Sequence, residues 1–302
     1  MTRAPLSPPL RQVAAARRLF SRELPLQTED YGRGVVLRWI EQFRLKDHDT
    51  RRVRISPADS TRPYWTLDAR NADDEGRTLF YVHGGGFVYY SAPLFVPLLC
   101  QWAVEHRMRV YVFEYPKAPE HDVASIFAMV QQTAGRVLEE TQGTVAIAGD
   151  SVGGLLALYL ASYAYPGRFS AMTLIYPVLA LHADWPSYHA FASGYFLDAE
   201  RMNWFLSLIT PAAQQLKFNP FSLSATALPP CHVHLAGHDI LRDEARAWAQ
   251  QMSGQGAPVL ATEHVELGHD FCLYAGRFEQ AQRATDRICE TLFQAHYPKN
   301  CS

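Results

Sequence analysis

The sequence has no excess of charge of either sign and no long apolar run, and both absences exclude classes of protein. Its 302 residues include 28 Lys and Arg against 30 Asp and Glu, which gives a formal net charge of -2. A chain so close to neutral has no overall attraction for nucleic acid or for an anionic membrane surface. No stretch approaches 18 consecutive apolar residues, so we expect no membrane span.

Cysteine is also scarce. The five cysteines stand at positions 100, 231, 272, 289 and 301, with no C-x-x-C pair and an odd total. This spacing indicates neither a zinc-thiolate site nor a disulfide framework, and we expect reduced, buried thiols in a cytoplasmic protein. The first acidic residue is Glu23, so the N-terminal segment is rich in arginine and poor in acid, as transit peptides are. We favour a basic surface helix over a transit peptide.

What the chain does have is apolar residues in an α/β pattern. Hydrophobic residues make up 48% of the sequence and charged residues 19%, which is typical of a globular protein with a large core. From about residue 50, short β-branched or aromatic runs alternate with helical patterns, which predicts βα units around a largely parallel sheet. The predicted strands are 52–55, 64–69, 78–82, 110–115, 145–148, 172–176, 232–235 and 259–265. The predicted helices are 125–138, 155–163 and about 274–293, and they would cover both faces of the sheet.

Two segments interrupt the alternation and are predicted to form a helical cap. They are residues 1–50 and about 184–225, while the catalytic domain would span 51–302. In the second segment we expect a helix that begins after Asp198 and stops at Pro211. Its apolar stripe consists of Met202, Phe205, Leu206 and Ile209. Trp204 and Leu208 lie off this stripe, so that side of the helix is either buried or faces an apolar pocket.

The strongest chemical signal is the run Gly149-Asp150-Ser151-Val152-Gly153-Gly154, directly after a predicted strand and before a predicted helix. This is the pattern G-x-S-x-G in the strand-turn-helix context that exposes a serine nucleophile. The two glycines beside the turn would allow strand and helix to come close together. A serine N-cap in a glycine-rich turn is the alternative reading of the same residues.

A second signal lies upstream, where the strand 78–82 runs into His83-Gly84-Gly85-Gly86-Phe87. Consecutive glycines allow backbone N–H groups to converge on one point, as an oxyanion hole requires, and the N–H of Val152 would join them. The alternative is a flexible glycine loop.

A serine nucleophile needs a base and an acid that orients the base. Asp239 follows the strand 232–235 and His269 follows the strand 259–265, in the order Ser, Asp, His. We prefer Asp239 to Asp243 because Asp243 and Glu244 fall in the first turn of the next helix, where acids favour the helix dipole.

Several other residues have weaker signals. His232 and His234 would lie on one face of a strand, as metal ligands can, but no third ligand is evident and a core or loop position is the better interpretation. Cys272 is expected to be a buried neighbour of His269. We predict a substrate pocket lined by aromatic and apolar residues from the glycine loop and the cap, namely Phe87, Tyr89, Tyr90, Phe196, Trp204 and Leu208. Rigid rings in that number would favour short to medium acyl chains.

Together these motifs resemble those of the hormone-sensitive-lipase family of α/β-hydrolase carboxylesterases, also called HGGG esterases. The resemblance covers about residues 78–275 and rests on five motifs in order, which are 83–87, 114–121, 149–154, 239–244 and 269–271. It implies an eight-stranded sheet, a mobile cap, and ester hydrolysis without a cofactor or metal. It also implies Ser151 as nucleophile, His269 as base and Asp239 as its orienting acid. The implied oxyanion donors are the N–H groups of Gly84, Gly85 and Val152.

The chain departs from the family pattern at Glu114, Pro116-Lys117, Val152 and Asp270. None of these departures removes a catalytic group, but Asp270 adds a carboxylate beside the base. We therefore expect a serine hydrolase that cleaves small-molecule esters through an acyl-enzyme. A homodimer is a further expectation. Acyl transfer and amide or formamide cleavage on the same triad are alternatives. A ligand-binding receptor that keeps the fold is another, although all three triad positions are filled.

Overall fold

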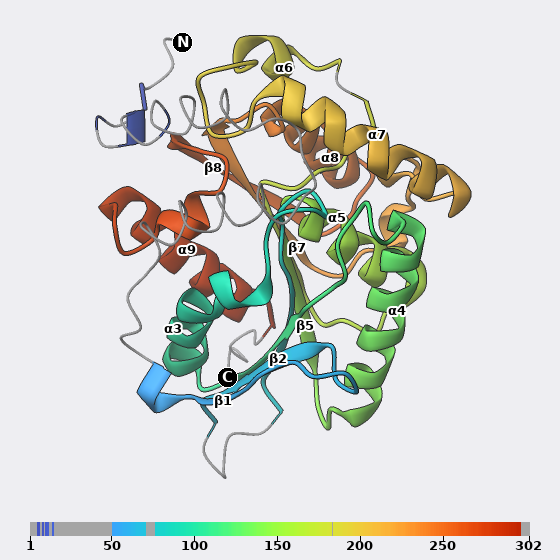
Figure 1. Ribbon diagram of the computed structural model, residues 1–302, viewed down its shortest axis with the longest axis vertical. Coiled ribbons are helices and arrows are strands. Elements are labelled where there is room, and N and C mark those ends of the chain that lie inside the picture. Colours follow the sequence, from blue (N-terminus) through green and yellow to red (C-terminus); the bar gives the residue numbers. More distant parts are fainter. Residues whose placement is uncertain are drawn as a thin grey trace.

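The computed structural model describes residues 50–70, 76–182 and 184–296, together with the separate positions 5, 6, 8, 10, 11 and 14. Most of the predicted N-terminal part of the cap, 1–50, therefore lies outside the described residues. An eight-stranded sheet crosses the molecule in the order β1-β2-β4-β3-β5-β6-β7-β8 (Figure 1). Its strands are β1 (Arg54–Ser56), β2 (Tyr64–Asp68), β3 (Thr78–Val82), β4 (Arg109–Phe113), β5 (Val145–Asp150), β6 (Met172–Ile175), β7 (Cys231–His238) and β8 (Val259–Gly268).

The sheet confirms the predicted fold class, and it begins with antiparallel strands. β2 pairs antiparallel with both β1 and β4, whereas every pair from β4 to β8 is parallel. All residues of β3 and β5 are buried, as expected for central strands covered on both faces. In their register Val82 lies opposite Gly149, so the glycine loop after β3 and the turn after β5 leave the sheet side by side.

Helices cover both faces of the sheet. α3 (Val96–His106) and α9 (Glu279–His296) lie on one side, and α4 (Val123–Glu140), α5 (Val152–Tyr159) and α8 (Arg242–Gly254) lie on the other (Figure 1). α5 continues as a π-helical turn over Leu160–Ala164. The predicted last helix begins later than expected, because Phe271–Tyr274 form a separate 3₁₀ turn.

The predicted insertion between β6 and β7 contains α6 (Pro186–Ala190) and α7 (Ala199–Gln215). Asp198 stands at the N-cap of α7 as expected, although its carboxylate accepts the N–H of Gly194 and caps no helix N–H. The prediction that Pro211 ends this helix is wrong, since α7 continues to Gln215. Ala212 and Ala213 extend its buried stripe, so tertiary packing outweighs the hydrogen bond that proline removes.

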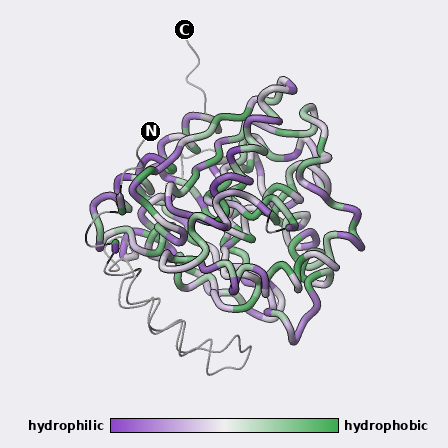
Figure 2. The backbone as a smooth tube through the Cα atoms, turned by 90° about the horizontal axis from the view of Figure 1, so that it is seen from above, coloured by the Kyte–Doolittle hydropathy of each residue, from purple (hydrophilic) through white to green (hydrophobic). Residues whose placement is uncertain are grey.

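The apolar residues form one core around the sheet. The most hydrophilic stretches of the backbone lie at its periphery (Figure 2). Within the described residues, none of the helices combines the length and the hydropathy that crossing a membrane would require.

Candidate active site

Ser151 occupies a sharp turn between β5 and α5. Its backbone has φ 55° and ψ -122°, a strained conformation for a residue other than glycine. The flanking glycines make this turn possible. A methyl group at Gly153 would lie 2.1 Å from the carbonyl oxygen of Val82, and one at Gly149 would lie 2.2 Å from the carbonyl oxygen of Gly153. The sequence pattern therefore does form the close strand-to-helix turn that it predicts.

The three residues proposed as a triad meet at the carboxyl ends of β5, β7 and β8. His269 Nε2 lies 3.1 Å from Ser151 Oγ, and His269 Nδ1 lies 2.6 Å from Asp239 Oδ2. The backbone N–H of Leu241 donates to the other carboxylate oxygen of Asp239, at 3.0 Å, and so fixes its orientation. With the Nδ1 proton directed at Asp239, Nε2 is the acceptor that faces the serine hydroxyl.

The competing acid, Asp243, is engaged elsewhere. Its Oδ1 atom accepts hydrogen bonds from Arg242, at 2.8 Å, and from Arg246, at 3.1 Å. Glu244 differs from the sequence interpretation, because it is fully buried and its Oε1 accepts the backbone N–H groups of Leu179 and Ala180. Both acids do fall in the first turn of α8, but neither is the carboxylate that contacts His269.

The structure corrects the expectation that the Gly84 N–H is an oxyanion donor. The N–H of Gly84 donates to Asp150 Oδ1 at 2.9 Å, so Gly84 cannot offer it to a substrate. Within the described ranges, no acceptor is seen for the N–H groups of Gly85, Gly86 and Val152. Gly85 and Gly86 both have positive φ, 106° and 63°, which turns the loop sharply in front of the serine. The signal that could have indicated this is the acid at position 150, whose side chain can accept a backbone N–H of the glycine loop.

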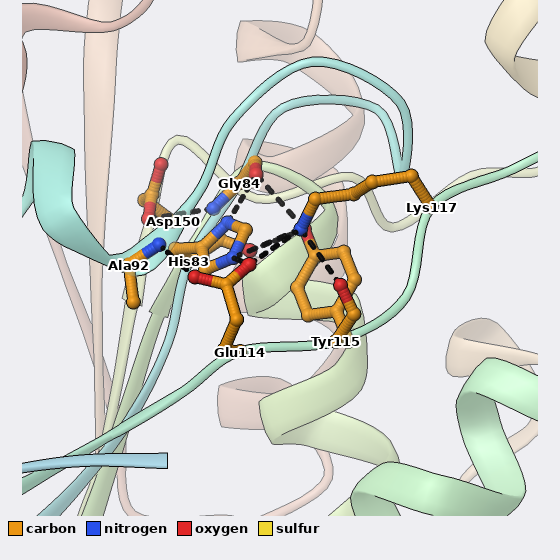
Figure 3. A network of polar contacts seen from close by, with 7 residues as sticks. All are labelled: His83, Gly84, Ala92, Glu114, Tyr115, Lys117 and Asp150. Carbon is orange, nitrogen blue, oxygen red and sulfur yellow. Dashed lines mark hydrogen bonds and ion pairs between the residues drawn. The ribbon is translucent and has the colours of Figure 1, made fainter. Parts of the chain in front are cut away.

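Buried and half-buried polar residues form a network that supports the glycine loop (Figure 3). Tyr115 donates its hydroxyl to the carbonyl oxygens of His83 and Gly84, both at 2.9 Å. Lys117 Nζ donates to Glu114 Oε1 at 3.1 Å, and the backbone N–H of Ala92 donates to Glu114 Oε2 at 2.7 Å. The departures at positions 114 and 117 thus pair with each other.

The charges of this network are complementary. Burial alone would raise the pKa of Glu114, but hydrogen bonding to His83 and the Lys117 ammonium lower it to about 2. Burial and the same ammonium lower the pKa of His83, which is stacked on the Tyr115 ring with centroids 4.3 Å apart. The loop therefore rests on an ionised carboxylate that is paired with Lys117.

The predicted pocket residues lie in different surroundings. Phe87 is fully buried and packs on the rings of Tyr115 and Phe127, so its role in the pocket stays a prediction. Its positive φ of 65° accompanies a turn of the chain that places this side chain in the core. Tyr89 contacts Trp204 of α7, with ring centroids 6.0 Å apart, and Leu208 is half-buried on the same helix.

Two further predicted pocket residues lie close to the triad. Tyr90 donates its hydroxyl to Asp270 Oδ2 at 2.7 Å. Phe196 contacts Gly268, where a methyl group would lie 2.2 Å from its ring. Sequence reasoning assigned Phe205 only to the packing stripe of α7, yet its ring fills the space beside Gly86, 2.3 Å from where a methyl group would stand. No local pattern distinguishes that contact from ordinary core packing.

Two buried carboxyl groups besides Asp239 lie near the imidazole. Burial and the negative charge of Asp270 raise the pKa of Asp150 to about 7, although Tyr81 donates a hydrogen bond to Asp150 Oδ1 at 2.8 Å. Asp270 Oδ1 lies 3.7 Å from His269 Nε2. Cys272 is buried next to these groups, as expected, and burial raises the pKa of its thiol.

The histidine pair on β7 gains a third imidazole from β8. His234 Nδ1 lies 3.2 Å from His264 Nε2, and His232 is stacked on His234. Burial lowers the pKa of His232 and His264 to about 4, so these rings are neutral. Their nitrogens do not converge on a point. In the described part of the chain, the one group of three ligand atoms close enough to share a metal is Glu105, His106 and Cys289 on α3 and α9, away from Ser151.

Comparison with known proteins agrees with this geometry. A family model described as alpha/beta hydrolase fold matches residues 79–273. The chain is 29% identical over 213 residues to an esterase of Gibberella moniliformis, covering 65% of this chain and 67% of that protein. It is also 29% identical over 234 residues to an ethyl acetate hydrolase of Pseudomonas putida, covering 72% and 73%. The crystal structure of a thermostable esterase from Pseudomonas putida superimposes with a TM-score of 0.78 at 22% identity, covering 96% of this chain and 98% of that one.

The sheet order, the serine turn and the matching family model define an α/β hydrolase. More narrowly, the chain belongs to the hormone-sensitive-lipase-like family of α/β hydrolases and is a carboxylesterase.

Proposed function

We propose that this carboxylesterase hydrolyses small carboxylic esters through an acyl-enzyme formed on Ser151. The observation that carries the proposal is the continuous path from Asp239 through His269 to Ser151, with hydrogen-bond distances of 2.6 and 3.1 Å. A serine hydroxyl becomes an effective nucleophile only when a positioned base removes its proton during attack. His269 Nε2 is that base, and the Asp239 carboxylate stabilises the imidazolium that forms.

In the first step Ser151 Oγ bonds to the ester carbonyl carbon while its proton moves to His269 Nε2. The carbonyl oxygen becomes an oxyanion, and the N–H groups of Gly85, Gly86 and Val152 are the donors we propose for it. When the tetrahedral intermediate collapses, the C–O bond to the alcohol breaks and Nε2 gives its proton to the departing oxygen. Water then attacks the acyl-enzyme with His269 as base, and the carboxylic acid leaves from Ser151.

The cap residues support a preference for short to medium acyl chains. The Phe205 ring lies against Gly86, and Tyr89 packs on both Phe205 and Trp204, with ring centroids 5.8 and 6.0 Å away. These rings stand beside the proposed oxyanion donors, where a long chain would need to displace them. The name of one relative, ethyl acetate hydrolase, is consistent with small substrates.

The proposal is tested with a fluorophosphonate probe and a panel of acyl esters. We expect the wild-type protein to be labelled covalently at Ser151 and to hydrolyse short esters, and the Ser151→Ala variant to do neither. Incubation with a chelator should leave the rate unchanged, because backbone N–H groups and not a metal meet the developing charge. A folded protein that is not labelled and cleaves no simple ester would favour the ligand-binding alternative.

Acyl transfer and amide cleavage use the same acyl-enzyme, so the acceptor and the leaving group must be varied separately. Adding alcohols to the ester assay measures the ratio of new ester to free acid, and anilides or formamides measure cleavage of the C–N bond. We expect free acid to predominate and esters to react faster than amides. A small-molecule ester is the proposed partner, while a cytoplasmic location and a homodimer stay predictions.

A further inference from the structure

We propose that Asp270 is a second positioning carboxylate for His269, which favours the protonated imidazole from the side of Nε2 and so sets the pH range of activity. This inference rests on the proposed function, because it assigns His269 as the base. It concerns a residue that the triad does not include.

The imidazole of His269 lies between two carboxylates. Asp239 Oδ2 is 2.6 Å from Nδ1, and Asp270 Oδ1 is 3.7 Å from Nε2. Nε2 is also the atom that faces Ser151 Oγ at 3.1 Å. Asp270 Oδ1 and Ser151 Oγ therefore lie near the same imidazole nitrogen, the one that would accept the serine proton.

The backbone explains how adjacent residues can face each other in this way. Asp270, the second residue after β8, has φ 62° and ψ 16°, the left-handed conformation. A residue in this conformation reverses the direction of the chain. Aspartate, asparagine and glycine tolerate it best, so the position accepts variants without new backbone strain.

A second contact fixes the carboxylate in place. Tyr90 donates its hydroxyl to Asp270 Oδ2 at 2.7 Å, and both residues are buried. Tyr90 also packs against the proposed oxyanion loop, since a methyl group at Gly85 would lie 2.7 Å from the Tyr90 side chain. The Asp270 carboxylate is thus linked through Tyr90 to the proposed oxyanion loop. It cannot turn away from His269 without losing its hydrogen bond to Tyr90.

A second buried carboxyl, Asp150 at the end of β5, belongs to the same cluster. Burial and then the negative charge of Asp270 raise the pKa of Asp150 to about 7. Two neighbouring buried carboxyls do not ionise together cheaply, so Asp150 holds its proton below about pH 7. Further titratable groups around this cluster include Tyr81 on β3, Tyr115 after β4, Tyr176 after β6, Cys272 on the 3₁₀ turn and, beside Asp239, Glu244 on α8. Burial raises the pKa of each of them.

The consequence is a shift of the acid limb of the pH profile. A carboxylate within about 4–6 Å of an imidazole favours its charged form, typically by one to three pH units. A protonated His269 cannot act as base, so the charge of Asp270 raises the pH at which activity appears. Asp270 does not itself accept the serine proton, which moves to His269 Nε2. Removing the Asp270 carboxylate should therefore largely preserve the plateau value of kcat/KM, whereas a triad variant should abolish it.

The experiment compares kcat/KM for a neutral short-chain 4-nitrophenyl ester from about pH 5 to 10 in Asp270→Asn, Asp270→Gly and wild type. We expect the acid limb of both variants to move to lower pH by about one unit or more, with a plateau within about tenfold of wild type. Asp243→Asn is the matched control, because it removes a carboxylate near the triad that pairs with Arg242 and Arg246 instead. Its profile should coincide with that of wild type.

A merely structural role would lower the plateau or the stability without moving the limb, and that result in both variants would overturn the proposal. A titration by NMR of the His269 ring protons, in a Ser151→Ala background with and without Asp270→Asn, gives the same answer without turnover. A lower midpoint in the double variant supports the role of Asp270, and equal midpoints refute it. If no protein hydrolyses any ester, the proposed function fails, but this titration still tests the contact.

Discussion

Asp150 Oδ1 accepts the backbone N–H of Gly84 at 2.9 Å, so the residue before the proposed nucleophile holds the glycine loop. The same oxygen accepts the hydroxyl of Tyr81. Asp150→Ala should leave both donors buried and unpaired, at about 1–3 kcal/mol each. We expect a lower free energy of unfolding in urea and a loss of kcat of about 10²-fold from a displaced loop. Asp150→Asn keeps an accepting oxygen and should retain most of both; equal losses in the two variants would contradict this role.

The proposed triad predicts a large and non-additive loss. Ser151→Ala, His269→Ala and Asp239→Asn should each lower kcat by on the order of 10³ to 10⁶, with circular dichroism unchanged, because the three side chains act as one unit. The double variant at Ser151 and His269 should be little worse than either single one. Asp243→Asn should keep its rate. If Asp243→Asn were as damaging as Asp239→Asn, the assignment of the acid would be wrong.

Close packing at the serine turn predicts which glycine can be changed. A methyl group at Gly153 would meet the carbonyl oxygen of Val82 at 2.1 Å, whereas Gly254 at the end of α8 has nothing within 4 Å and no positive φ. Gly153→Ala should therefore destabilise the protein by about 1–3 kcal/mol or more and abolish activity. Gly254→Ala, the control, should change the free energy of unfolding by less than about 1 kcal/mol. A fully active Gly153→Ala protein would show that the turn can widen.

Glu244 makes stability depend on pH in a defined direction. Burial raises its pKa to about 8, even though it accepts the N–H groups of Leu179 and Ala180. Between about pH 4.5 and 8 the folded state then holds a proton that the unfolded state has lost, so stability falls as pH rises through this window. Glu244→Gln removes this titration and should flatten the fall measured by urea unfolding between pH 5 and 8. Glu263→Gln, at a partly exposed residue paired with Arg246, should keep the wild-type slope.

Much of the fold, and the way its elements bring the residues of the proposed triad together, could be predicted because the signals are local. The strand 78–82 has the predicted bounds, and the glycines at 149 and 153 fit only a close turn between a strand and a helix. Asp239 and His269 could be found because each follows a strand, and parallel strands end at one edge of the sheet.

The errors share a different cause, which is contact between segments far apart in sequence. Gly84 was misassigned because Asp150, 66 positions away, takes its N–H. Pro211 would end an isolated helix, but the packing of α7 carries it on to Gln215. These features depend on contacts with residues that are distant in sequence, and the periodicity of the apolar residues does not reveal such contacts.

The cap predicts how acyl-chain preference can be altered. Trp204 is half-buried on α7 and packs on Tyr89 and Phe205, with ring centroids 6.0 and 5.3 Å away. Removing this ring should open the cap side of the proposed pocket, so the acyl length that gives the highest kcat/KM should increase in Trp204→Ala.

Trp185→Ala is the matched control, because it removes the same ring from the same inserted segment, where Trp185 stacks on His182 and Phe221 and not on Tyr89. Both variants should lose stability through lost packing, by about 3–5 kcal/mol at most, and only Trp204→Ala should change the chain-length profile. Each profile is measured with 4-nitrophenyl esters from acetate to laurate, below the unfolding temperature of each variant. A wild-type profile in folded Trp204→Ala, or a wild-type rate that rises steadily through the long esters, would show that these rings do not limit the acyl chain.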